Sequence, residues 1–174
     1  MNSKGLRWHA GGLAFVTTLG LLYLGQLLYQ TYAVARPLAE ALRGIDGVEK
    51  VEIADSLKGR DPLVIEVALD NPANFAATYA ALEKRTAGIL GREPFHLVIR
   101  DHRTDELAAL YHEMRFILQE AAARGNFSAM ASKAQALARA AGATICLDVD
   151  ADRIYIKLNK GGAALYEVIP RLRI

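Results

Sequence analysis

The feature that most constrains this chain is an uncharged stretch close to its N-terminus. No Asp, Glu, Lys or Arg occurs between Trp8 and Ala35, and residues 11–28 are mostly apolar. A helix needs about 20 predominantly apolar residues to cross a bilayer. Trp8 and Tyr29 are 21 residues apart, about 31 Å along a helix and close to the thickness of the hydrocarbon layer. We therefore predict a transmembrane helix within a basic tail and anchor at residues 1–35, with Trp8, Tyr29 and Tyr32 at the membrane interfaces.

The basic residues around this stretch are almost evenly divided. Lys4, Arg7 and the amino terminus precede it, and Arg36 and Arg43 follow it. A short basic tail before a span favours an N-terminus in the cytoplasm. We therefore expect a single-pass protein of the cell membrane whose remaining residues, 36–174, are extracytoplasmic.

A cleaved signal peptide is the alternative interpretation. Residues 33–35 read Ala-Val-Ala, which fits an A-x-A cleavage site and would release a secreted chain after Ala35. The apolar stretch of about 18 residues is longer than the 7–15 or so that are usual in signal peptides. This difference in length favours an anchor that is retained.

Composition excludes several other classes of protein. The chain has 174 residues, 52% of them hydrophobic, with a formal net charge of +2 and one cysteine. A single cysteine cannot close an internal disulfide. Proteins dedicated to nucleic acid usually carry a strong basic excess, so we expect no nucleic-acid partner.

Residues 36–103, here called the first half, read as an αββαβ module. Pro37 suits the first turn of a short helix that ends at Gly44. Residues 48–53 and 63–69 are rich in β-branched residues, which predicts two strands. Asn71 followed by Pro72 predicts the start of a second helix, with Asn71 as its N-cap, and Gly91 predicts its end. Residues 95–100 alternate as a half-buried strand does.

Residues 104–174, the second half, read as two helices followed by three strands. Thr104 can cap a helix whose apolar stripe continues to Ala121, and a second amphipathic helix runs from Phe127 to Ala141. The short break between them predicts an αα-hairpin. Three alternating stretches then predict an antiparallel meander. The fold class is therefore α+β, and we expect the second half to pack on the first because each is near the size at which a lone core is marginal.

One aromatic residue lies off the apolar stripe of the first of these helices. Phe116 is about 200° from Met114 at 100° per residue, on a face that also carries His112 and Ala123. An isolated exposed aromatic is one interpretation. The other is a second contact, with the first half or with a partner subunit. We treat His112, Phe116 and Ala123 as a candidate contact face.

The residues that could carry chemistry form no recognisable set. Asp148, Asp150 and Asp152 alternate, but an EF-hand would need a glycine at its sixth position, where Arg153 stands. His96, His102 and His112 match no spacing of metal ligands, and Cys146 has no histidine at a telling distance. We predict no catalytic residues, no metal site, no cofactor and no enzyme activity. A basic series that could meet lipid headgroups is interleaved with acidic residues; it consists of Lys84, Arg85, Arg92, Arg100 and Arg103.

The order of elements in the first half resembles a known type of domain. The relevant elements are the segment from Leu42 to Ile53, the strand from Leu63 to Leu69 and the helix and strand after them. Over residues 37–101, their order resembles that of the αββαβ ring-building domains. Those domains occur behind a single membrane anchor in type III secretion and sporulation-channel proteins. The same order of elements is also similar to that of the cytoplasmic domain of cation-diffusion-facilitator transporters. The first resemblance implies assembly of neighbouring copies around a pore.

These observations together predict a structural or adaptor component of a membrane assembly. It would be anchored in the lipid bilayer and act by contact with other membrane or envelope proteins, including copies of itself. The alternative is a membrane-tethered sensor or regulatory domain that binds a small ligand or metal.

Overall fold

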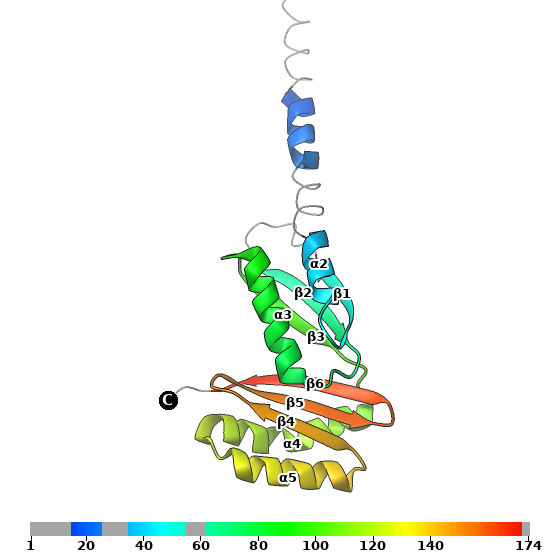
Figure 1. The fold of residues 1–174 in the computed structure, drawn as a ribbon, viewed down its shortest axis with the longest axis vertical. Coiled ribbons are helices and arrows are strands. Elements are labelled where there is room, and N and C mark those ends of the chain that lie inside the picture. The colour runs from blue at the N-terminus through cyan, green and yellow to red at the C-terminus, as the bar shows by residue number, and fades with distance from the viewer. Residues whose placement is uncertain (1–14, 26–34, 55–61, 172–174) are drawn as a thin grey trace, which may run out of the picture.

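The computed structural model describes residues 15–25, 35–54 and 62–171 of the chain. These residues form an α+β structure with two three-stranded sheets (Figure 1). After a helical stretch at 15–25, the elements are α2 (Arg36–Arg43), β1 (Val48–Ala54), β2 (Leu63–Leu69), α3 (Phe75–Leu90), β3 (Phe95–Arg100), α4 (Asp105–Arg124), α5 (Phe127–Ala140), β4 (Thr144–Val149), β5 (Arg153–Lys160) and β6 (Ala163–Pro170). The α+β class and the order of elements from α2 to β6 agree with the prediction.

The predicted membrane span is described only in part, as the helical stretch at 15–25. Across the described ranges, we find no helix whose length and apolar character would let it cross a membrane. The predicted interface residues Trp8, Tyr29 and Tyr32 lie outside the described residues. So do residues 33 and 34 of the A-x-A sequence, whereas Ala35 is the N-cap residue of α2.

The first half is a sheet covered by helices on one face. Its strands lie in the order β1-β2-β3, with β1 and β2 antiparallel and β2 and β3 parallel on either side of the α3 crossover. Alternate residues of β2 are buried, as expected where successive side chains point to opposite faces. A core between this sheet and the helices includes Leu38, Leu42, Ile65, Val67, Leu69 and Leu82.

The start of α3 differs from the prediction. The N-cap is Asn74, whose side-chain oxygen accepts a hydrogen bond from the N–H of Ala77 at 2.9 Å. Asn71 instead has a φ of 43°, and Pro72 lies in the turn before the helix. That turn is held against Gly47, whose carbonyl accepts a hydrogen bond from the N–H of Asp70 at 3.0 Å. The prediction failed because a tertiary contact uses the Asn-Pro pair as a turn.

The second half is an antiparallel meander packed on an αα-hairpin. Its strands lie in the order β4-β5-β6. Thr104 caps α4 as predicted, accepting a hydrogen bond from the N–H of Leu107 at 3.4 Å. Gly125 ends α4 in the left-handed conformation that favours glycine. The core between the hairpin and one face of the sheet includes Leu107, Met114, Leu118, Met130, Ile154, Ile156, Leu158 and Leu165.

The centre of the second sheet is buried on both faces. Ile154 and Ile156 belong to the core with α4 and α5, whereas Tyr155 between them belongs to the core of the first half. Tyr166 on β6 also faces the first half. Figure 1 shows the resulting series of layers, with the second sheet between the first half and the α4–α5 hairpin.

Candidate functional site at the junction of the two halves

An aromatic cluster joins the first turn of α3 to the second sheet. The ring of Phe75 lies 6.1 Å from that of Tyr155 and 5.1 Å from that of Tyr166, measured between centroids. Tyr79, one turn later on α3, lies 5.8 Å from Tyr155. Phe75 is 3% exposed, so this cluster is the apolar centre of the junction.

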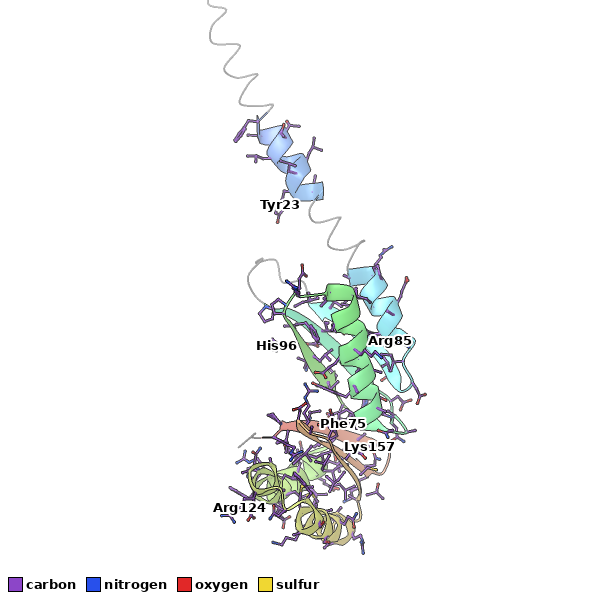
Figure 2. All side chains as sticks on the ribbon, turned by 60° about the vertical axis from the view of Figure 1, so that its left-hand side comes forward. Tyr23, Phe75, Arg85, His96, Arg124 and Lys157 are labelled. Atoms are coloured by element: carbon purple, nitrogen blue, oxygen red, sulfur yellow. The ribbon has the colours of Figure 1, made fainter. Side chains whose placement is uncertain are left out.

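Charged side chains flank this cluster. Arg153 forms two hydrogen bonds to the carboxylate of Glu83, at 2.6 and 2.7 Å, and both side chains are about one-third exposed. The ammonium group of Lys157 donates to the carbonyl of Pro72 at 2.6 Å. In Figure 2 the Lys157 side chain lies beside Phe75 at this end of α3. These bonds tie β5 to the turn before α3, at Pro72, and to the middle of α3, at Glu83.

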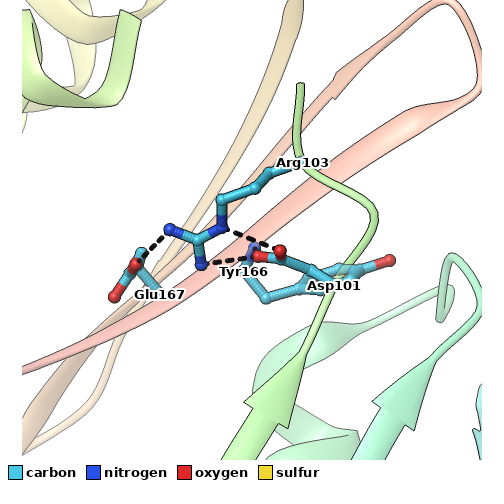
Figure 3. Close-up of polar contacts among 4 residues, drawn as sticks. All are labelled: Asp101, Arg103, Tyr166 and Glu167. Carbon is cyan, nitrogen blue, oxygen red and sulfur yellow. Dashed lines mark hydrogen bonds and ion pairs between the residues drawn. The ribbon is translucent and has the colours of Figure 1, made fainter. Parts of the chain in front are cut away.

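A second polar group closes the edge of β6 (Figure 3). The carboxylate of Asp101, 4% exposed, accepts two hydrogen bonds from Arg103 at 2.7 and 2.8 Å and a third from the N–H of Tyr166 at 3.0 Å. Arg103 also reaches Glu167 at 3.0 Å. His102 forms a β-bridge with Ala164. The connection between the halves therefore covers the edge of β6 that β5 leaves unpaired.

A cavity of about 500 Å³ opens beside this junction. It lies between the end of β2, the start of β4 and the β5–β6 hairpin, whose turn glycines have positive φ. Its lining is mainly polar; it includes Asp70, Asn71, His102, Thr144, Asn159 and Lys160. Lys160 forms an ion pair with Glu106 at 2.7 Å. This lining offers both hydrogen-bond donors and hydrogen-bond acceptors to a small polar molecule.

The tyrosines of the cluster are held in their neutral form. Burial raises the pKa of Tyr155 above its ordinary 10.0, and the hydrogen bond to Asp150 adds to this rise. Burial also raises the pKa of Tyr166, while the backbone of Asn71 opposes the shift. Neither phenol is shifted towards ionisation, so both are neutral at neutral pH. Tyr155 donates a hydrogen bond to the carboxylate of Asp150 at 2.7 Å, whereas Tyr166 packs its ring against Phe75.

The predicted contact face lies away from the junction. Phe116 is 73% exposed, and the guanidinium of Arg115 lies 5.7 Å from the centre of its ring. His112 is exposed and Ala123 is half-buried on the same helix. Phe116 is not among the residues of the core of the first half, and its exposure fits both an isolated aromatic and a contact with a partner.

The other residues considered from the sequence are spread over the fold. Asp150 accepts hydrogen bonds from the N–H groups of Asp152 and Arg153, both at 2.7 Å, as in the polar turn that the sequence suggests. The three histidines lie on β3, beside β6 and on α4. Within the described ranges, no group of three or more His, Cys, Asp or Glu residues is placed to hold a metal ion. Cys146 is exposed on β4.

A second surface that the sequence did not single out is the face of the first sheet opposite α2 and α3, here called the open face. Among its residues are Lys50, Glu52, Glu66, Val98 and Arg100, on three adjacent strands. Arg100 forms two hydrogen bonds to Glu66, at 2.8 and 2.9 Å, which lower the pKa of that carboxyl. Val98 is 36% exposed beside them.

Sequence reasoning missed the junction, although one signal was present. The alternation of Ile154, Ile156 and Leu158 predicts one buried face of β5, and it leaves Tyr155 on the other face. An aromatic residue on the second face of a strand is consistent with a second buried layer. No comparable signal marks the cavity, because its residues come from four separate segments.

Comparison with known proteins finds no family model, no curated protein and no solved structure that matches this chain. The resemblance of residues 37–101 to ring-building domains therefore stays a prediction.

Proposed function

We propose that this chain is a single-pass, membrane-anchored structural or adaptor component of a membrane protein assembly. Its N-terminal apolar segment holds it in the bilayer, and its two packed halves act through contacts with other proteins. In this proposal residues 36–174 are extracytoplasmic, and the chain carries out no catalysis.

The observation that carries the proposal is the environment of the helical stretch at 15–25. Every described side chain in it is exposed. At about 100° per residue its apolar side chains point to all sides of the helix rather than to one. A helix that is apolar all round is suited to burial in a membrane or a large core. The large apolar side chains, 49–66% exposed, are Phe15, Val16, Leu19, Leu21, Leu22, Tyr23 and Leu24.

Two exposed surfaces support action by protein contact. The open face presents Val98 among charged side chains that already pair with one another. The contact face on α4 presents Phe116, whose ring is mostly in solvent. Aromatic residues and arginine are both enriched where protein surfaces meet, and here Arg115 lies against the ring of Phe116.

The anchor and its orientation are tested with the one cysteine of the chain. Cys146 is exposed, so a membrane-impermeant maleimide should label it on intact cells without lysis. The Cys146→Ser variant is the control for labelling of other proteins. Labelling only after lysis would place residues 36–174 in the cytoplasm. Extraction of the protein from membranes by alkaline carbonate would contradict an integral anchor, and a mature chain that begins at Arg36 would show cleavage instead.

The contact function is tested by cross-linking the full chain in its native membrane. We expect cross-linked partners, and we expect Val98→Asp or Phe116→Asp to reduce their yield. Gln135→Asp, at an exposed position of α5, is the matched control and should leave the yield unchanged. A chain that sediments as a monomer from mild detergent, with no cross-linked partner in the membrane, would refute the proposal.

A second function, that of a tethered ligand-binding domain, is favoured by the junction cavity. Its volume of about 500 Å³ lies within the range of about 300–1,000 Å³ that is common for small-molecule sites. Native mass spectrometry of the full chain tests for a small molecule that co-purifies. Lys160→Ala should remove such a molecule, and Lys133→Ala on the exposed side of α5 should not.

A further inference from the structure

Two helix ends of the first half lie at the same level. The guanidinium of Arg85 on α3 donates to the carbonyl of Ala41 on α2 at 2.7 Å, and the two helices run in opposite directions (Figure 1). Arg36 lies five residues from Ala41 and Leu90 lies five residues from Arg85, each about 7.5 Å along its helix. The start of α2 and the end of α3 therefore form one end of the molecule, here called the proximal end.

This end is also where the apolar N-terminal segment joins the fold. The uncharged stretch finishes at Ala35, and Arg36 is the first residue of α2. Between the apolar run at 11–28 and Arg36 the sequence has only seven residues, 29–35, and none of them is charged. A membrane anchor in this stretch would thus deliver the proximal end directly to the surface of the bilayer.

The side chains at the proximal end suit a headgroup layer. Ile89, in the last turn of α3, is 42% exposed, and Arg92 just beyond the helix is exposed. An apolar side chain with a nearby arginine fits the membrane interface, because the arginine stem can cover apolar surface while its charge stays in water. Glu40 and Glu93 balance Arg36 and Arg92 in formal charge.

Other basic residues of the series considered from the sequence are engaged within the fold. Arg100 is bound to Glu66 on the open face, and Arg103 is bound to Asp101 at the junction. Because these two arginines are paired elsewhere in the fold, they add no positive charge to the proximal end. Binding there should therefore depend little on anionic lipid.

We propose that the proximal end docks on the lipid headgroup layer, with Ile89 at the interface and α3 standing away from the bilayer. This inference rests on the proposed membrane anchor. It places the junction and then the α4–α5 hairpin at increasing distance from the membrane, since Phe75 lies about 21 Å from Ile89 along α3. The contact face with Phe116 would then be the part of the molecule presented to partners beyond the membrane surface.

The test measures how close labelled positions on one helix come to the bilayer. The full chain, with Cys146→Ser, is reconstituted in phosphatidylcholine vesicles that contain nitroxide-headgroup lipid. A fluorophore is attached to Ile89→Cys or, as matched control, to Ala77→Cys. Ala77 is exposed on the same helix and about 18 Å nearer its N-terminus. The chain without substitutions, labelled at Cys146, provides a second distal position because Cys146 lies near Phe75.

We expect the nitroxide lipid to quench the fluorophore at position 89 and to leave those at 77 and 146 unchanged. The result should be the same when one-third of the lipid is phosphatidylglycerol, because the formal charges balance. Equal quenching at all positions, or none at position 89, would overturn the docking proposal while the protein stays in the vesicles. Protein that does not float with the vesicles would overturn the anchor itself, and with it the docking.

Discussion

Replacing Phe75 with alanine tests whether the aromatic cluster is what joins the two halves. The Phe75 side chain is 3% exposed and contacts three tyrosine rings at centroid distances of 5.1–6.2 Å. Removing a buried phenylalanine generally costs about 3–5 kcal/mol. For a protein of this length, that corresponds to a fall in melting temperature of roughly 10 °C. We expect Phe75→Ala to lower the free energy of unfolding by about 3–5 kcal/mol.

Phe116→Ala is the matched control because it removes the same side chain from a position that is 73% exposed. Exposed substitutions of this kind usually change stability by less than about 0.5 kcal/mol. The measurement is denaturant unfolding of the full chain in detergent, followed by far-ultraviolet circular dichroism and tyrosine fluorescence. If the junction couples the halves, Phe75→Ala should also separate the two signals into distinct transitions.

Two results would refute this reasoning. A loss below about 1 kcal/mol for Phe75→Ala would show that the cluster contributes little more than an exposed side chain does. Equal effects of Phe75→Ala and Phe116→Ala on the detergent-solubilised monomer would show that burial at the junction does not set the difference. Either result would remove the energetic basis for treating the junction as a rigid connection.

Three further predictions concern other positions. Glu83→Ala should lower the free energy of unfolding by about 1 kcal/mol, because it leaves Arg153 without its carboxylate at a partly exposed site. A loss no larger than that from breaking the exposed Glu120–Arg124 pair on α4 would count against this. Burial raises the pKa of Asp150, but hydrogen bonds outweigh it and lower the pKa below its ordinary 3.8. The contribution of the Asp150 carboxylate to stability is therefore complete above pH 3.8 and is lost as acid protonates the folded carboxylate. Asp150→Asn should flatten the fall in unfolding free energy below about pH 4. An unchanged dependence of unfolding free energy on pH would contradict this. Gly47→Ala should destabilise by more than about 1 kcal/mol, since its φ is +78° and a Cβ would lie 2.5 Å from that of Pro72; a melting temperature equal to that of the unsubstituted chain would exclude this clash.

Local patterns in the sequence were sufficient to predict most of the fold. The strand at Leu63–Leu69 and the helix capped by Thr104 were both expected at those positions. Alternation and helical periodicity report which face of an element is buried, and capping residues report where a helix begins. These signals are contained within single elements, so tertiary structure is not needed to interpret them.

The junction and the start of α3 required information from distant parts of the chain. Asn71 is of a residue type that is common at N-caps, but Pro72 packs against Gly47 and the helix begins after Asn74 instead. Tyr155 is buried by Phe75, 80 residues earlier in the chain. Periodicity within one element cannot identify a partner at that separation. The cavity was missed for the same reason.

The burial of the second sheet on both faces has a mechanical consequence. The first half, the second sheet and the α4–α5 hairpin form successive layers, so a pull applied to the hairpin reaches the N-terminal segment through each layer in turn. The two apolar cores resist it along continuous hydrogen-bonded strands. Between them, the load passes through one aromatic cluster, the Glu83–Arg153 pair, the hydrogen bond of Lys157 to Pro72 and the side chains around Asp101. Under tension the molecule would yield at this junction first, with each half still folded.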